Sequence, residues 1–267
     1  MTFSLDIYYD KLSDLGGEYN LLNHQLVQFK SKTKLIPCIG AEIEFYLDGQ
    51  IDLKMLKTME KATGYVLKKE KGKNQYEIEL PPSNDLASYA RQIVQVREGV
   101  IHAANKLGAR ADFSSKPYED DYGNSMHIHL NFQRNEDSAE NKGEDGNKDI
   151  EKYARILCHY LPETIEYYLP KPEDYRRLDS KFMAPTHISY GGNNRTLLIR
   201  IPDSKPKRLE HRLPAANANP AHVIYAMLQS IDRGLQHPGE ISSLKKTFGN
   251  AFDPQYGLER IGARKLC

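Results

Sequence analysis

The chain contains no tryptophan, only three cysteines and no long apolar run, and its opposite charges nearly cancel. Lys and Arg number 37 against 36 Asp and Glu, which argues against a broadly basic surface for nucleic acid. No stretch approaches the roughly 18 apolar residues that span a bilayer, and no basic start with an apolar block indicates a secretory signal. Cys38, Cys158 and Cys267 lack CxxC or CxxH spacing, which excludes a zinc knuckle and disfavours a disulfide framework. We therefore expect a cytoplasmic protein that binds neither membrane nor nucleic acid.

The pattern of apolar residues predicts an α+β fold, a curved, mostly antiparallel sheet with flanking helices. Alternating or strand-like segments are residues 41–49, 75–80, 126–132, 194–201 and 208–213. Helical spacing covers residues 86–104, 150–160 and 223–235, with Asp85 and Asn219-Pro220 as starts and Gly108 as a stop. Pro81-Pro82 is expected to end a strand. Residues 1–33 give only a weak helical signal, and the polar segment 134–149 predicts an exposed loop.

Four of the expected strands carry polar residues two positions apart, opposite a continuous apolar face. The pairs are Glu42 and Glu44, Glu77 and Glu79, His127 and His129, and Glu210 and Arg212. If the apolar faces pack on helices, these polar side chains line one common side of the sheet. Carboxylates with one or two imidazoles suit a hard divalent cation such as Mg²⁺ or Mn²⁺ better than zinc. For any one pair alone, a solvated sheet face is the plainer interpretation.

Basic residues concentrate between positions 176 and 212. The cluster holds Arg176, Arg177, Arg195, Arg200, Lys205, Lys207, Arg208 and Arg212. A guanidinium offers a planar fork for carboxylate or phosphate, and a metal beside such forks suits a nucleoside triphosphate. Neither a GxxxxGK[ST] loop nor a GxGxxG turn after a strand is present, so the two common nucleotide-binding scaffolds are excluded. The residues themselves indicate a metal- and anion-binding sheet, for which phosphoryl transfer is one fitting chemistry.

Taken in order, five segments resemble the catalytic domain of the glutamine synthetase family. AEIEFYLDG is similar to the family's opening strand, in which two glutamates are separated by one residue. EKGKNQYEIEL resembles its glutamates seven residues apart, and KPYEDDYGNSMHIHL its glycine-rich loop and His-x-His strand. NNRTLLIRIP and KRLEHRLPAANANP resemble its Asn-Arg-Ser, Ile-Arg-Ile-Pro, Arg-Ile-Glu-x-Arg and Ala-Asn-Pro stretches. The resemblance runs from about Leu35 to Gly234.

The resemblance implies two or three Mg²⁺ or Mn²⁺ ions around the phosphates of ATP. One ion would be held by Glu44, Glu70 and Glu77, and another by Glu42, His127 and Glu210. The nucleotide would be bound by His129, Arg200, Lys205 and Arg208. Phosphoryl charge and catalysis would depend on Arg195 and Arg212, with Arg200 assisting. The substrate would be bound by Arg177, Arg212 and Gly123.

Two polar residues on these strands are expected outside the site. Glu79 has no counterpart in the family and is expected at the surface. His211 faces the apolar side of its strand together with Leu209 and Leu213, so we expect it to be a packed histidine.

Three departures from the family pattern fall on the side that receives ammonium. Only 34 residues precede the resemblance, so we expect the family's β-grasp domain, whose Asp binds ammonium in the neighbouring subunit, to be absent. Met183 replaces the glutamate of the family's Glu-Ala-Pro flap, and methionine accepts no proton. Gly-Asn-Ser stands in place of Gly-Ser-Gly at residues 123–125, and Tyr122 stands where Asn is common beside the substrate amino group.

We therefore expect residues 1–34 to be a lead segment and residues 35–267 a glutamine synthetase-like catalytic domain. Its expected activity is that of an ATP-dependent carboxylate–amine ligase that works through an acyl-phosphate. The departures favour an amine other than ammonium, because a less polar amine suits Met183 and an amine of lower pKa needs less help from a base. A non-catalytic nucleotide-binding regulatory relative and a true glutamine synthetase stay open as alternatives. The substrates are expected to be small molecules, and the pattern is compatible with a homo-oligomer.

Overall fold

The computed structural model describes residues 17–134 and 147–266, which form an eight-stranded sheet. The strand order is β2-β3-β1-β5-β8-β7-β6, and β4 also pairs with β1. Within the described ranges every pairing is antiparallel except that of β6 with β7. The strands are β1 Leu35–Asp48, β2 Lys68–Lys69, β3 Gln75–Ser83, β4 Arg110–Asp112, β5 Met126–Arg134, β6 Tyr190–Gly191, β7 Ile199–Arg200 and β8 Leu209–His211. The predicted mostly antiparallel sheet is confirmed.

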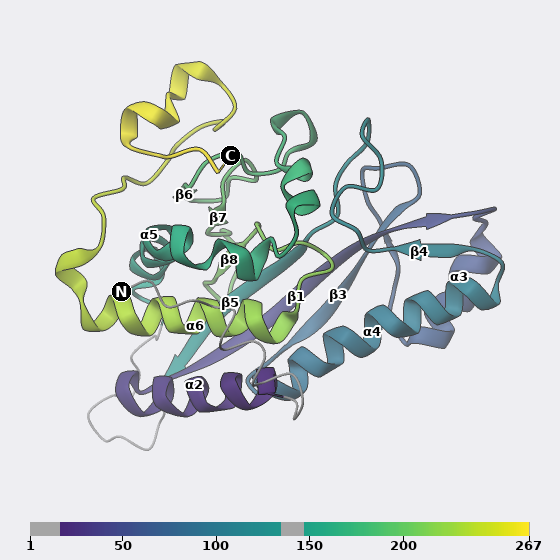
Figure 1. Cartoon of the computed structure of the whole chain (residues 1–267), viewed down its shortest axis with the longest axis horizontal. Coiled ribbons are helices and arrows are strands. Elements are labelled where there is room, and N and C mark those ends of the chain that lie inside the picture. Colours follow the sequence, from purple (N-terminus) through teal and green to yellow (C-terminus); the bar gives the residue numbers. More distant parts are fainter. Residues whose placement is uncertain (1–16, 135–146, 267) are drawn as a thin grey trace.

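Long helices pack on one face of this sheet (Figure 1). They are α2 Gly17–Thr33, α3 Leu53–Thr63, α4 Leu86–Lys106, α5 Ile150–Tyr168 and α6 Pro220–Gln236. Helix α6 contacts α2, α4 and α5, so these helices form one layer. Among the residues that the structure describes, no helix combines the length and apolar character needed to cross a membrane. The predicted α+β class is confirmed.

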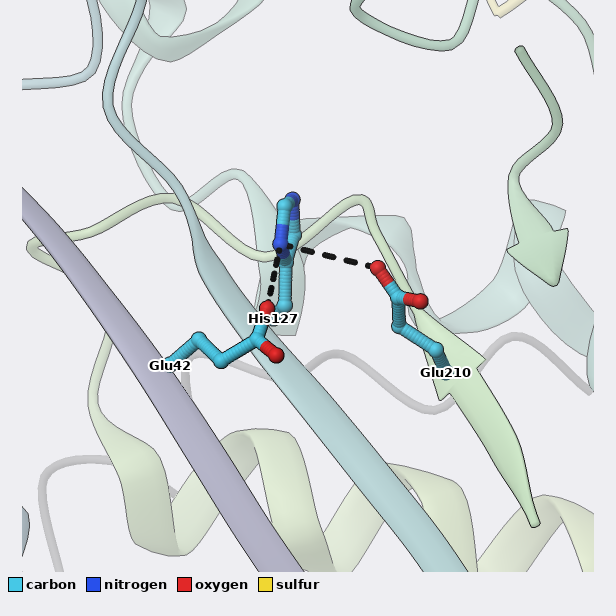
Figure 2. Close-up of side chains that lie close together, drawn as sticks. All are labelled: Glu42, His127 and Glu210. Carbon is cyan, nitrogen blue, oxygen red and sulfur yellow. Dashed lines mark hydrogen bonds and ion pairs between the residues drawn. The ribbon is translucent and has the colours of Figure 1, made fainter. Parts of the chain in front are cut away.

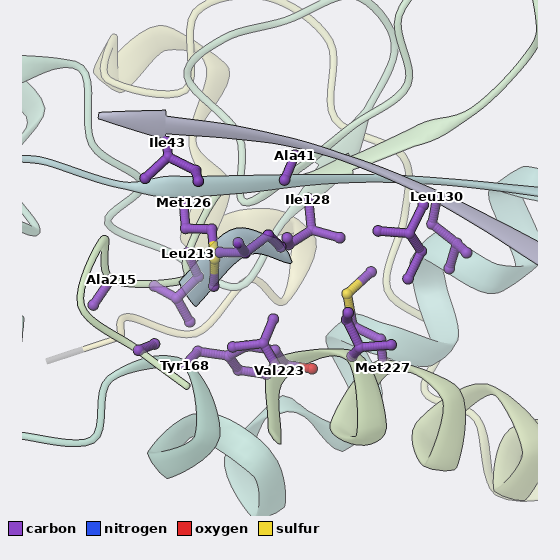
Figure 3. Packing of buried hydrophobic residues seen from close by; sticks show 14 of the residues in the cluster. Ala41, Ile43, Met126, Ile128, Leu130, Tyr168, Leu213, Ala215, Val223 and Met227 are labelled. Carbon is purple, nitrogen blue, oxygen red and sulfur yellow. The ribbon is translucent and has the colours of Figure 1, made fainter. Parts of the chain in front are cut away.

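The core lies between the sheet and the helix layer. Ile128 and Leu130 of β5 point toward Val223 and Met227 of α6, and all four side chains are fully buried (Figure 3). His211 is also fully buried, with its ring 4.4 Å from that of Tyr168, which confirms the predicted packed histidine. Because the apolar side chains of β1 and β5 turn toward the helices, their polar neighbours turn to the opposite face.

The predicted helix caps are present, although one predicted core residue is not buried. Asp85 accepts a hydrogen bond from the Ser88 amide at 3.3 Å, and Asn219 accepts one from Ala221 at 2.9 Å. Gly108 has φ 75, the left-handed geometry that ends a helix. Ile101 lies on the expected apolar stripe of α4 yet is 39% exposed.

Several predicted boundaries were wrong for local physical reasons. Pro81-Pro82 does not end β3, because the register with β1 shifts there and a bulge tolerates residues that lack an N–H. Helix α5 continues past Pro162 to Tyr168, while β7 and β8 are shorter than expected. Helix α3 was missed, and α2 lies in the segment that gave only a weak helical signal, yet its Leu22 and Phe29 join the common core. Most of the predicted loop 134–149 lies outside the described residues.

Candidate active site

The strand register brings the predicted polar residues together on the face away from the helices. Glu42 of β1 pairs with His127 of β5, and Glu44 pairs with Glu77 of β3. On the other side of β5, His129 pairs with Glu210 of β8, which in turn pairs with Arg200 of β7. Cross-strand partners share a face of the sheet, so segments up to about 170 residues apart in sequence meet here. The pattern of polar pairs therefore predicted the cluster correctly.

His127 lies at the centre of the cluster (Figure 2). Its Nδ1 is 3.2 Å from Glu42 Oε2 and 3.6 Å from Glu210 Oε1. Its Nε2 is 2.8 Å from Ser125 Oγ, and that hydroxyl donates to Glu44 Oε2 at 2.7 Å. The Ser125 hydroxyl therefore links the imidazole of His127 to the carboxylate of Glu44.

Arginines surround Glu210, whose side chain is almost fully buried. Arg200 Nη1 donates to Glu210 Oε2 at 2.6 Å, and Arg212 Nε donates to Glu210 Oε1 at 3.2 Å. Arg212 Nη1 also donates to the carbonyl of Arg195, whose own side chain is exposed at the cavity. These contacts fix guanidinium groups beside the carboxylate cluster, where they offer positive charge to an anionic ligand.

The carboxylates and arginines line one cavity of about 210 Å³. Of the predicted site residues it includes Glu42, Glu44, Glu70, Glu77, Gly123, His127, Arg177, Arg195, Arg200, Glu210 and Arg212. Glu79 also lies at its rim, where it forms an ion pair with Lys68 and is partly exposed as expected. Carboxylates of the strands and arginines from residues 177–212 thus line the same polar cavity.

Burial and mutual repulsion shift the ionisation of these groups in different directions. Burial raises the pKa of the Glu77 carboxyl to about 8, and the charges of Glu42 and Glu44 act in the same direction. Burial acts likewise on Glu42 and Glu210, yet the pKa of each is held below its ordinary value by His127, together with His129 for Glu42 and Arg212 for Glu210. Burial would lower the pKa of His127, but Glu42 and Glu44 hold it above its ordinary value.

A second cavity of about 280 Å³ adjoins the first across Glu42 and Glu79, which line both. His129 and Arg208, predicted nucleotide-binding residues, line it together with Cys38 and Asn131. Arg208 Nε donates to His129 Nδ1 at 3.2 Å, and His129 Nε2 lies 2.8 Å from Glu42 Oε1. Lys205 is exposed and lines neither cavity, so the structure does not bring it together with the other predicted nucleotide-binding residues.

Arg177 is buried at the base of the first cavity. Its Nη2 donates to the carbonyls of Arg212, Leu213 and Pro214, while its Nε has no hydrogen-bond partner among the described residues. A Cβ on Gly123 would lie 2.7 Å from Cβ of Arg177 and 2.6 Å from the Ser115 carbonyl oxygen, so only glycine fits there. Gly123 therefore allows the loop before β5 to pack directly on Arg177.

Three residues that line the site or hold it were missed as contributors: Ser125, Gln75 and Phe182. Ser125 bridges His127 and Glu44, and Gln75 Nε2 donates to the carbonyl of Gly123 at 3.0 Å. Tyr122 and Phe182 line the first cavity, with ring centroids 5.6 Å apart. Ser125 extends the i, i+2 series of His127 and His129, a signal that could have identified it.

Comparison with known sequences agrees with this arrangement. A family model described as "Glutamine synthetase, catalytic domain" matches residues 48–251. The chain belongs to the glutamine synthetase family. The match begins after the glutamate-bearing part of β1, yet the register places Glu42 and Glu44 beside Glu77 and His127. The family resemblance noted from the five segments is confirmed.

The chain matches only part of the length of its curated relatives. "Gamma-glutamylputrescine synthetase PuuA" of Escherichia coli K12 is 31% identical over 194 residues, 71% of this chain and 40% of PuuA. The glutamine synthetase of Pyrococcus woesei is 33% identical over 176 residues, 64% of this chain and 39% of that protein. The chain thus spans about two fifths of the length of these curated relatives.

Solved structures share the fold. A complex of GmaS with ADP superposes with a TM-score of 0.75 at 22% identity, covering 94% of this chain and 65% of that one. The glutamine synthetase of Plasmodium falciparum gives a TM-score of 0.66 at 15% identity over 82% of this chain and 56% of that one. These similarities establish the glutamine synthetase fold for the described residues.

Proposed function

We propose that this chain is an ATP-dependent carboxylate–amine ligase that works through an acyl-phosphate and uses an amine other than ammonium. The observation that carries the proposal is the convergence of Glu42, Glu44, Glu77 and Glu210 with His127 in one cavity walled by arginines. A ligase needs such a chamber because a carboxylate becomes reactive only after phosphorylation, and phosphorylation gathers negative charge.

The donor set fits the divalent ions that the family implies. Ligand atoms of Glu42, His127 and Glu210 lie within 4.8 Å of one another, as do those of Glu44, Glu77 and His127. Oxygen-rich sets with one imidazole suit Mg²⁺ or Mn²⁺. Because Nδ1 of His127 faces Glu42 and Glu210, we assign His127 to that ion and Glu44, Glu77 and Glu70 to another. Bound ions would offset phosphate charge and polarise the transferred phosphoryl group.

The basic residues and His129 have separate roles in this proposal: some would bind the nucleotide, some would stabilise the phosphoryl group, and one would bind the substrate. His129 and Arg208, and Lys205 after rearrangement of its exposed side chain, would bind the nucleotide from the second cavity. Arg195, Arg200 and Arg212 would stabilise the phosphoryl group as it leaves ADP. Arg177, whose Nε has no hydrogen-bond partner within residues 17–134 and 147–266, would bind the substrate carboxylate.

The reaction has two steps. An oxygen of the substrate carboxylate forms a bond to the γ-phosphorus of ATP, and the bond from that phosphorus to ADP breaks. The amine nitrogen then forms a bond to the acyl carbon, and phosphate leaves with the electron pair of the broken C–O bond. Met183 lines the cavity where the family pattern has glutamate, and its apolar thioether supports an amine less polar than ammonium.

We further propose that residues 35–267 act as the catalytic domain, that the lead segment 1–34 contributes α2 to its core, and that the chain self-associates. Light scattering on the full chain measures the assembly directly. A mass near 30.5 kDa, that of one chain, would contradict self-association without affecting the ligase proposal.

The test is to incubate the full chain with ATP, Mg²⁺, a panel of carboxylates and a panel of amines. L-Glutamate is the first acid to use, because the names of both curated relatives point to a glutamyl group. We expect ADP release with a matching amide in the mass spectrum, lost in Glu77→Ala and kept in Glu98→Ala, whose carboxylate is exposed on α4. Calorimetric binding of Mg·ATP without ADP release with any pair would instead identify a regulatory relative. Preference for ammonium over every amine would identify a glutamine synthetase.

A further inference from the structure

One wall of the first cavity is apolar and carries no carboxylate. Its members are Tyr122, Phe182, Met183, Ala184 and Pro185. Every carboxylate that lines the cavity belongs instead to β1, β3, β8 or the turn between β2 and β3. Because removing apolar surface from water is favourable, a carbon group that covered this wall would be stabilised there.

The strands that carry the carboxylates also fix the position of this wall. Tyr46, two residues after Glu44, donates its hydroxyl hydrogen to the Tyr122 carbonyl at 2.9 Å. Gln75, two residues before Glu77, donates to the neighbouring Gly123 carbonyl at 3.0 Å. Tyr122 is therefore attached to the same two strands as the metal-binding carboxylates, and its distance from the reacting centre is set by their register.

Phe182 is held against Tyr122 by a buried lysine. The two rings meet edge to face with centroids 5.6 Å apart, and Lys116 Nζ lies 3.6 Å from the centroid of Phe182. Lys116 is 7% exposed, and its ammonium donates to the carbonyl of Asp121 beside Tyr122. Lys116 thus connects the Tyr122 loop to the Phe182 loop and fixes the gap between their rings.

Met183 completes the wall in an unusual backbone conformation. Its φ of 60 lies in the left-handed region that bulky residues seldom adopt. Amides of Met183 and Ala184 donate to the carbonyls of Ser180 and Asp179 at 3.1 and 3.2 Å, which closes the loop tightly. This geometry turns a flexible thioether, 37% exposed, to the cavity beside Phe182.

We propose that this wall, made by Tyr122, Phe182 and Met183, receives the carbon group of a primary amine that bears an alkyl or aryl substituent. The inference deepens the proposed ligase function and rests on it. The substituent packs on the two rings and the thioether while the nitrogen reaches the acyl carbon. As the N–C bond forms and the C–O bond breaks, the nitrogen loses one proton to phosphate or water, because the wall offers no base.

The test compares amines in the full chain with Mg·ATP and L-glutamate. The panel is ammonium, methylamine, n-butylamine and benzylamine, with hydroxylamine as a small nucleophile that traps an acyl-phosphate. Butylamine or benzylamine is expected to exceed ammonium in kcat/KM by at least about tenfold, because one methylene in an apolar pocket is worth about 10–200-fold. A wall variant that lost kcat/KM equally with every amine would not indicate a specificity wall.

Variants separate the wall from the rest of the site. Phe182→Ala, and Met183→Gly, which suits a φ of 60, are expected to raise KM for the preferred amine by about tenfold, the low end of the value of an apolar contact. KM for ATP and glutamate should stay unchanged, and turnover with hydroxylamine should fall less than turnover with the preferred amine. Phe182→Leu should retain most of the preference, and Phe248→Ala, at a 72% exposed ring outside the site, is the matched control.

Each outcome is decisive. Preference for ammonium that neither variant alters overturns this inference and the choice of an amine other than ammonium, whereas ATP-dependent ligation itself stands if hydroxylamine still releases ADP. Equal changes in KM for amine, ATP and glutamate would show a merely structural wall and also overturn it. Absence of ADP release with every nucleophile, hydroxylamine included, overturns both.

Discussion

His127 forms a hydrogen-bonded chain that connects the two groups of acidic ligands. One ring nitrogen faces Glu42 and Glu210, and the other reaches Glu44 through the Ser125 hydroxyl. Ser125 therefore orients both a carboxylate and the imidazole without being a ligand in the proposed metal sites. Groups in this position commonly set ligand orientation and tune affinity.

Removing the Ser125 hydroxyl should weaken metal binding without unfolding the chain. Ser125→Ala is expected to lower Mn²⁺ affinity by about 10–100-fold, because Glu44 and His127 lose the group that fixes their orientation. Calorimetric titration with Mn²⁺ measures the effect, and Ser243→Ala, at an exposed serine outside the site, is the control. Equal Mn²⁺ affinity in the two variants would show that Ser125 does not orient the ligands.

Individual site residues could be predicted from the sequence where period-two spacing on a strand coincided with acidic or imidazole side chains. Acidic and imidazole residues two positions apart on strands were recognisable, because period-two spacing places them on one face. Phe182 was not recognisable, since its role depends on Lys116 and Tyr122, 66 and 60 residues earlier in the chain. Packing between loops leaves no periodic signal in either segment.

Strand β1 is the element on which the site is built. It pairs with β3 along one edge and with β5 along the other, and the same strand holds Glu42 opposite His127 and Glu44 opposite Glu77. A shift by one residue would turn both glutamates into the core. The position of the whole acidic cluster therefore depends on the register of this one strand.

A glycine in α6 sets how closely α5 can approach. A Cβ on Gly234 would lie 2.5 Å from Cγ2 of Ile156, whereas one on Gly99 in α4 would meet nothing within 4 Å. Gly234→Ala is expected to lower the free energy of unfolding by about 1–3 kcal/mol through overpacking. Gly99→Ala should raise it by about 0.5–1 kcal/mol, the usual gain of alanine over glycine within a helix.

Chemical denaturation of the two variants and the unmodified chain measures these opposite changes. Each substitution adds the same methyl group to a helix interior, so any difference in sign comes from the surroundings of the glycine. A stabilised Gly234→Ala variant would contradict the close packing of α5 on α6.

Helices and strands with strong periodic patterns could be predicted from the sequence. Those whose bounds depend on caps or on tertiary contacts were predicted less accurately. Helix α3 carries both signals of a helix, since Asp52 accepts from the Met55 amide and Gly64 has φ 78, but its short apolar stripe conceals them. The continuation of β3 through Pro81-Pro82 depends on a bulge against β1, which no local pattern reveals.

Across the whole molecule, a net charge of +1 conceals a strong separation of charge. Buried carboxylates gather on β1, β3 and β8, and the arginines that face them come from residues 177–212. Such an arrangement couples stability to pH, because grouped acids repel one another when all are ionised.

Without divalent ions, stability should fall as pH rises from about 6.5 to 8, above the range in which buried His211, whose pKa is lowered to about 3, acts in the opposite direction. The pKa of Glu77 is raised by burial and neighbouring carboxylates to about 8, so the folded chain holds a proton that the unfolded chain has lost. His127, whose pKa is also raised by its carboxylate partners, acts in the same direction. Thermal melts in EDTA between pH 6.5 and 8.5 measure this slope.

Two comparisons complete the pH experiment. Glu77→Gln should flatten the slope, since the amide neither titrates nor repels the other carboxylates, and saturating Mg²⁺ should flatten it by favouring the ionised form. A melting temperature that rises steadily with pH in EDTA would contradict the proposed proton on Glu77.

The acyl-phosphate is tested most directly by isotope transfer. L-Glutamate labelled with ¹⁸O in its side-chain carboxyl is incubated with the full chain, Mg·ATP and the preferred amine, and the released phosphate is analysed by mass spectrometry. One labelled oxygen per amide is expected in phosphate, because the oxygen that attacks phosphorus leaves with it when nitrogen attacks carbon. Amide formation with unlabelled phosphate, or ADP release without amide from any acid and amine, would contradict the proposed ligase.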